Sequence, residues 1–178
     1  MNQQTQSFMH EISPRQLLQT AAAMNLSLGA LILGSLYHNA ETWLQDYPKP
    51  IQERYGPKSP EAERLTKLWA IPFFIVLFGG VLAANWRLRR AHGRLSPTAA
   101  FANAYLLFLS FWLFDLTIID WLIMVGMKPS FAILPGTEGM AEYNDAMYHL
   151  RESWPFLFVM AIPSAVIALL TAGGPRHG

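Results

Sequence analysis

The segment FDLTIIDWLIMVG, residues 114–126, places two carboxyl groups, Asp115 and Asp120, in a run that is otherwise apolar. An ionised aspartate near the centre of a bilayer costs about 2.5–3.5 kcal/mol. Each carboxyl group must therefore be shielded, paired, protonated or close to water. Carboxyl groups in partly dry surroundings are useful proton donors and acceptors, so both aspartates are candidate ligand-binding residues.

The two aspartates are expected on different faces of one helix. At 100° per residue, Asp115 lies roughly 140° from Asp120. Polar residues spaced seven apart form a stripe that ends near Asp120 and not near Asp115. They are Asn103, Ser110 and Thr117. The stripe predicts that Asp120 faces a hydrated mouth of the helix bundle, where a histidine such as His38 or His149 can pair with it.

Further groups with useful chemistry lie in two segments that follow apolar runs. The stretch YHNAETW supplies His38 and Glu41, and the stretch LPGTEGMAEYNDAMYHLRESW supplies acids and one histidine. Together with the two aspartates, these groups predict a ligand-binding pocket on the outer face of the membrane. The pocket candidates outside the apolar run are His38, Glu41, Glu138, Glu142, Asp145 and His149.

A short helix over residues 140–152 would bring Asp145, His149 and Glu152 to one face, because residues i, i+4 and i+7 lie side by side. Such a face can bind a cation or relay protons, so these three residues are the candidate metal ligands. An exposed polar helix explains the same pattern without a ligand. A haem held by His38 and His149 would need an axial geometry that no spacing here specifies. Both a metal and a cofactor therefore stay unassigned.

The composition indicates that the chain lies in a lipid bilayer. Of 178 residues, 52% are apolar and 14% are charged, whereas soluble domains carry about 25% charged residues. Four apolar runs, residues 17–38, 68–86, 98–127 and 154–171, are near or above the roughly 17–25 residues that a spanning helix needs. The sequence predicts a polytopic integral membrane protein of the all-α class. We expect a single domain, a compact bundle of four transmembrane helices with a short helix on its outer face.

Basic residues predict the orientation. The linker RLRRAHGRLS carries Arg87, Arg89, Arg90 and Arg94 without any acid, and the positive-inside rule places such a linker in the cytoplasm. With four spans, the N and C termini are then cytoplasmic too, in a bacterial-type inner membrane. No aromatic platform accompanies the arginines, so nucleic acid is not an expected partner. The absence of cysteine excludes disulfides and thiolate chemistry.

Two functions remain open. In the first, the outward-opening pocket binds or processes a small molecule, a lipid headgroup or a cation, and whether it is an enzyme is undecided. In the second, the chain is a non-catalytic accessory or assembly subunit of a larger membrane complex, and its aspartates bond to partner helices. Expected partners are membrane lipids and either a homo-oligomer or a larger complex.

Overall fold

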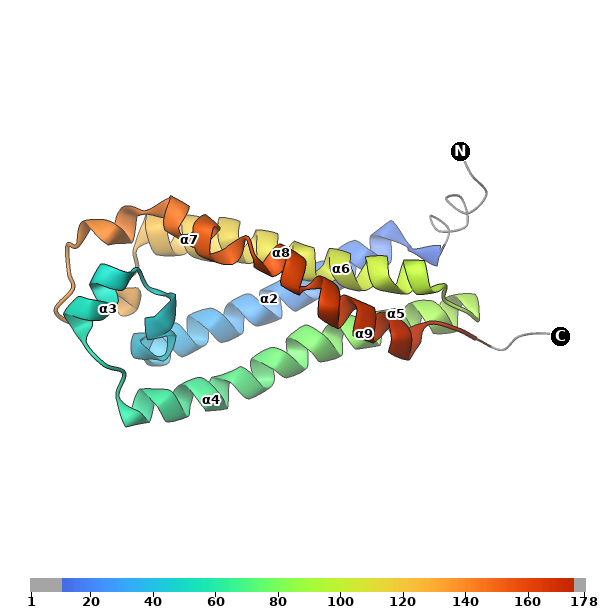
Figure 1. Cartoon of the computed structure of the whole chain (residues 1–178), viewed down its shortest axis with the longest axis horizontal. Coiled ribbons are helices and arrows are strands. Elements are labelled where there is room, and N and C mark those ends of the chain that lie inside the picture. The colour runs from blue at the N-terminus through green and yellow to red at the C-terminus, as the bar shows by residue number, and fades with distance from the viewer. Residues whose placement is uncertain (1–10, 175–178) are drawn as a thin grey trace. The chain divides into compact units, whose positions relative to one another are not determined.

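The computed structural model describes residues 11–174 of the chain, and within this range all regular elements are helical (Figure 1). The α-helical elements are α2 (Pro14–His38), α3 (Lys49–Tyr55), α4 (Pro60–Phe74), α5 (Gly80–His92), α6 (Pro97–Phe114), α7 (Ala146–Ser153), α8 (Phe156–Val159) and α9 (Ala161–Thr171). The other helical elements are the 3-10 turns η1 (Ala40–Asp46), η4 (Ser130–Ala132) and η5 (Ala141–Asn144), and the π-helices η2 (Ile75–Gly79) and η3 (Asp115–Met127).

The described residues contain four helical stretches long and apolar enough to cross a membrane, as predicted. They are Pro14–His38, Pro60–His92, Pro97–Met127 and Ala146–Thr171. The second and third begin with serine caps followed by proline: the Ser59 hydroxyl accepts from the backbone N–H of Ala62, and the Ser96 hydroxyl accepts from that of Ala99, both at 3.2 Å. These stretches identify the chain as a multi-pass α-helical membrane protein.

The chain divides into two compact units, to which all four spans contribute. Unit 1 comprises Met1–Asn25, Ile75–Trp112 and Pro155–Gly178, and unit 2 comprises Leu26–Phe74 and Leu113–Trp154.

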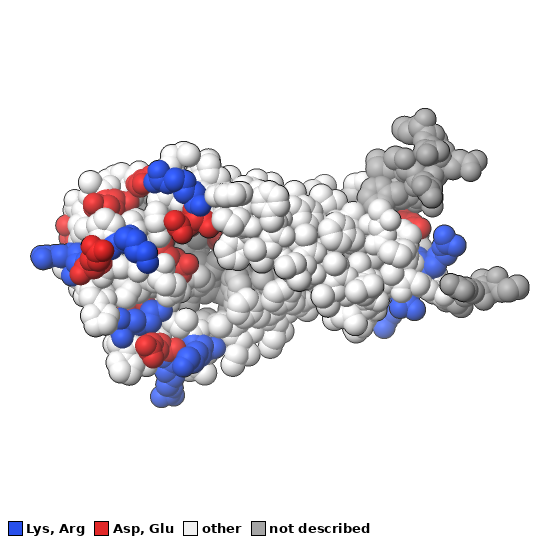
Figure 2. All heavy atoms as spheres, in the orientation of Figure 1, with Lys and Arg blue, Asp and Glu red and all other residues white. Residues whose placement is uncertain are grey.

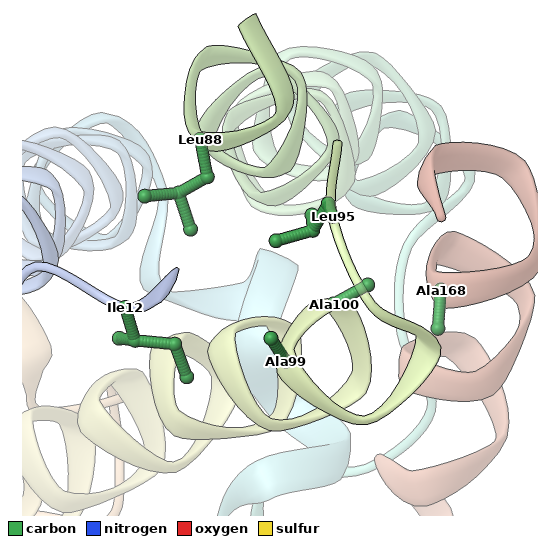
Figure 3. Close-up of a cluster of buried hydrophobic side chains, with 6 residues drawn as sticks. All are labelled: Ile12, Leu88, Leu95, Ala99, Ala100 and Ala168. Atoms are coloured by element: carbon green, nitrogen blue, oxygen red, sulfur yellow. The ribbon is translucent and has the colours of Figure 1, made fainter. Parts of the chain in front are cut away.

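Small apolar residues let the helices of unit 1 pack closely. Ala99, Ala100 and Ala168 are buried from α6 and α9, and larger side chains of the same core fill the space beside them (Figure 3). The complete cluster is Ile12, Leu88, Leu95, Ala99, Ala100 and Ala168. In a bilayer, where lipid tails are as apolar as leucine, close contact of this kind is a main source of helix association.

A buried polar network also joins α5, α6 and α9 within unit 1. The Asn85 side-chain amide donates to the Ala100 carbonyl at 2.9 Å and to the Thr171 hydroxyl at 3.0 Å. The Asn103 amide in turn donates to the Asn85 side-chain oxygen at 2.8 Å. Asn103 is thus a structural residue of unit 1, and its expected membership of a hydrated stripe gives way to a buried hydrogen bond.

The loops of unit 2 form an ordered cap with a core of its own. Residues that are buried together come from η1, α3 and the 132–144 region: Leu44, Tyr47, Ile51, Leu134 and Tyr143. The Tyr47 hydroxyl donates to the Ala132 carbonyl at 2.7 Å, and the Tyr148 hydroxyl donates to the Tyr47 carbonyl at 2.9 Å. These contacts hold the two loop segments against each other.

Candidate functional site

Asp120 and His149 form an ion pair in unit 2. The imidazole Nδ1 of His149 lies 3.3 Å from the Asp120 carboxylate, and each side chain is 18% exposed. Two local contacts place the histidine there. Asp145 caps α7 by accepting from the Tyr148 backbone N–H at 3.0 Å, and the Trp121 indole donates to the Ala146 carbonyl at 2.9 Å, which ties the start of α7 to η3.

The prediction that Asp115 and Asp120 lie about 140° apart assumed an α-helix, and the structure has a different helix there. This helix, η3, is a π-helix over Asp115–Met127. A π-helix bonds residue i to residue i+5, and it therefore stacks residues five apart that an α-helix would separate. The two aspartates are five apart and share one side of the helix.

A third carboxyl group, Asp46, belongs to the same site. It ends η1. Asp46 is exposed at the surface, yet the protein packed around its carboxyl group desolvates it and raises its pKa to about 6. The Asp120 charge adds to this rise, while Lys58, Gln45 and His149 oppose it. Asp46, Asp115, Asp120 and His149 are called the acid–histidine cluster below.

Glu41 and His38, two further candidates, lie beside other partners. Both carboxylate oxygens of buried Glu41 bond to Ser59, one to its backbone N–H and the other to its hydroxyl at 2.9 Å. Glu41 therefore stabilises the start of α4, where a negative charge is favourable. His38 ends α2 on an exposed position, with its ring centroid 6.4 Å from that of Trp69.

The acids of the 138–152 region lie mostly at the surface. Glu138 is exposed, and its carboxylate accepts from the Gly136 backbone N–H at 3.1 Å. Hydrogen bonding to its own backbone N–H first, and to that of Gly136 second, lowers the pKa of Glu138. Glu142 lies half-buried in η5, and Glu152 lies exposed in α7. Figure 2 shows acidic and basic side chains gathered over α3, α7 and the start of α4.

The expected helix over residues 140–152, which carries the candidate metal ligands Asp145, His149 and Glu152, is interrupted at Asp145. Asp145 has non-helical backbone angles (φ −82°, ψ 83°) and serves as the cap between η5 and α7. Its carboxylate pairs with the Arg151 guanidinium at 2.7 Å instead of turning toward His149. Within residues 11–174, no group of three or more His, Asp or Glu side chains is arranged to hold a metal ion.

Asp46 is the member of the cluster that sequence reasoning missed. The available signal was its place directly before Tyr47, in a loop dense in aromatic and apolar residues. Such a loop can fold into a cap that brings its acids over a bundle, whereas a polar loop would leave them in water. Comparison of the chain with protein-family models, curated proteins and solved structures finds no match.

Proposed function

We propose that this membrane protein uses the acid–histidine cluster to bind a small cationic molecule or the cationic part of a lipid headgroup. The observation that carries the proposal is the half-buried Asp120–His149 pair with Asp115 and Asp46 acting on the same site. Clustered carboxyl groups in partly dry surroundings gain from a bound positive charge, because it relieves their mutual repulsion.

An organic cation fits these residues better than a bare metal ion. Ca²⁺ needs six to eight oxygen ligands and Mg²⁺ needs near-octahedral ones, and the described residues bring no three ligand side chains into metal-binding geometry. An ammonium group needs only one or two close carboxylates, and the remaining contacts can be apolar. The aromatic side chain of Tyr148 stands next to His149, with ring centroids 5.5 Å apart, and can supply such a contact.

The cluster also suggests how a ligand would compete for its place. The His149 imidazole already lies against the Asp120 carboxylate, so an incoming cation must displace it. Replacing His149 by a neutral residue should therefore strengthen cation binding, whereas replacing Asp120 should abolish it.

The test measures the thermal stability of the purified full chain in detergent while ethanolamine, choline, Mg²⁺ or Ca²⁺ is titrated in. We expect one of the organic cations to raise the melting temperature, the Asp120→Asn variant to lose this rise, and the His149→Gln variant to show it at lower concentration. Asp145→Asn is the matched control, because it removes one carboxylate from the exposed Asp145–Arg151 pair and keeps an oxygen for the α7 cap.

Equal responses in the Asp120→Asn and Asp145→Asn variants would contradict a specific site. A response to the metal ions alone would contradict the organic ligand. No response in any variant would remove the support for a binding function and favour the alternative role as an accessory subunit.

A further inference from the structure

Unit 1 contains an open groove of about 380 Å³ at the end of α5, lined by Trp86, Arg89, Arg90 and Gly93. We call it the arginine groove. Gly93 ends the helix in the left-handed region (φ 71°), and an added Cβ there would meet no atom within 4 Å. The helix end thus turns away without a side chain and leaves the space beside the two arginines open.

The two arginines of the groove are positively charged and can bind an anion. Arg89 is half-buried and Arg90 is exposed, and neither takes part in an ion pair among the residues that the structure describes. The planar guanidinium matches a phosphate through two parallel hydrogen bonds. Basic residues at a helix C-terminus are also favoured by the helix dipole, but that preference requires neither a groove nor an aromatic wall.

The position along α5 sets the depth of the groove in a membrane. Residues 68–86 contain no charged side chain, and 19 helical residues extend about 28 Å, close to the roughly 30 Å of a bilayer hydrocarbon core. Trp86, which is 46% exposed, then lies at the membrane interface. Arg89 and Arg90 follow within one turn, at the level of the lipid headgroups.

We propose that the arginine groove binds the phosphate of an anionic phospholipid headgroup. Arg89 and Arg90 hold the phosphate, and the Trp86 indole packs against the glycerol region of the same lipid. Basic pockets beside transmembrane helices are suited to such headgroups. This site lies in unit 1 and does not depend on the acid–histidine cluster of unit 2.

The experiment follows lipid binding to the full chain in detergent by native mass spectrometry and by melting temperature. Phosphatidylglycerol, phosphatidylcholine and inorganic phosphate are added separately. The Arg89→Gln/Arg90→Gln variant is compared with Arg87→Gln/Arg94→Gln, which removes the same charge from exposed positions outside the groove. An Arg89→Lys/Arg90→Lys variant keeps the charge and loses the planar fork.

We expect phosphatidylglycerol to bind best, and the groove variant to lose affinity by about 100-fold, since each of the two charge-assisted guanidinium–phosphate contacts contributes about ten-fold. The control pair should change the affinity by less than about three-fold, because solvent and salt screen its charges. The lysine variant should bind between these two.

Equal losses in the groove and control variants would show diffuse attraction and overturn the site. Equal binding of phosphatidylcholine would overturn the anionic headgroup, and equal stabilisation by inorganic phosphate would overturn the lipid as the source of the phosphate. Full binding by the lysine variant would overturn the bidentate contact. Melting temperatures without lipid check that each variant folds.

Discussion

Two acid–base pairs involving α7 differ in solvent exposure, and this difference decides how much each pair contributes to stability. Asp145 and Arg151 are 2.7 Å apart but 42% and 63% exposed, whereas Asp120 and His149 are 3.3 Å apart and 18% exposed each. Water screens the first pair despite its shorter distance, and exposed pairs contribute only about 0–1 kcal/mol. The second pair interacts through protein more than through solvent, so its loss should matter more.

Double-mutant cycles on the two pairs test this difference. With Asp120→Asn and His149→Gln we expect a coupling energy of about 1–3 kcal/mol, and with Asp145→Asn and Arg151→Gln less than about 0.5 kcal/mol. The free energy of unfolding in mixed micelles, measured for each single and double variant, gives both values. Equal coupling in the two cycles would mean that the Asp120–His149 contact is screened like a surface pair.

Asp46 predicts a pH dependence of stability. Its pKa in the folded chain, about 6, lies above the ordinary value of 3.8 because of desolvation first and the Asp120 charge second. The folded state therefore binds this proton more tightly than the unfolded state does. The resulting stabilisation is fully present below about pH 4 and is lost as the pH rises to about 6.

The Asp46→Asn variant should lack this loss. Relative to the unmodified chain, its free energy of unfolding should increase between about pH 4 and pH 6 and keep a constant advantage above that range. Unfolding titrations at several pH values measure the difference, with Asp145→Asn as the control for removal of an exposed carboxylate. A difference that does not vary across this pH range would contradict the proposed environment of Asp46.

At the residue scale, sequence reasoning named Asp115, Asp120 and His149 as candidates but missed Asp46. The hypothesis that Asp120 pairs with a histidine came from its position near the end of an apolar run, and His149 was one of two choices. His38 could not be separated from it, because the sequence does not reveal that His38 ends its helix beside Trp69. Asp46 could not be found from the sequence, because its place depends on how its loop packs against the 132–144 region.

At the scale of elements, the π-helix η3 explains why the angular prediction failed. A uniformly apolar segment contains no periodic pattern that distinguishes 3.6 residues per turn from a wider helix, so the α-helical value was the default. The helix caps were easier to predict from the sequence: Ser59-Pro60 and Ser96-Pro97 begin helices in the structure, as their residue types predict. Asp145 is also a cap residue by type, and its role there interrupts the helix expected over residues 140–152.

Gly29 of α2 marks a close helix contact in unit 2. A Cβ at this position would lie 2.9 Å from the Phe114 ring and 3.6 Å from Ile119. Gly29→Ala should therefore push Phe114 away from the start of η3 and destabilise the chain by about 1–3 kcal/mol. Gly34→Ala is the matched control in the same helix, because its Cβ would meet only Trp69 at 4.0 Å.

Thermal unfolding of both variants measures the difference. The control should be neutral or more stable by up to about 1 kcal/mol, since alanine favours helix over glycine. If Gly29→Ala is as stable as Gly34→Ala, the aromatic ring has room to move and the close contact does not constrain η3.

At the scale of the whole molecule, the four spans were predictable because length and apolar composition follow from the thickness of a bilayer. The spans extend beyond the apolar runs, to Pro60–His92 for the second, because helices continue into water where caps and charged residues allow it. The ordered cap of unit 2 was harder to predict from the sequence. It depends on side-chain contacts between residues far apart in sequence, such as Tyr47 with Ala132.

The absence of cysteine allows a direct test of orientation. Single cysteines placed at two exposed positions, Ala91→Cys at the end of α5 and Glu138→Cys in the loop of unit 2, provide one reactive thiol each. The excess of arginine around Ala91 predicts that this end faces the cytoplasm and that the Glu138 loop faces outward.

A membrane-impermeant maleimide should therefore label the Glu138→Cys protein in intact cells and the Ala91→Cys protein only after the membrane is opened. Labelling is read on gels, and the unmodified chain provides a background without any thiol. The reverse pattern would place the arginines outside and would turn the acid–histidine cluster toward the cytoplasm, where the ligand it meets would be a cytoplasmic cation. Labelling of both positions in intact cells would contradict the number of crossings between them, because residues 91 and 138 are separated by one span, Pro97–Met127.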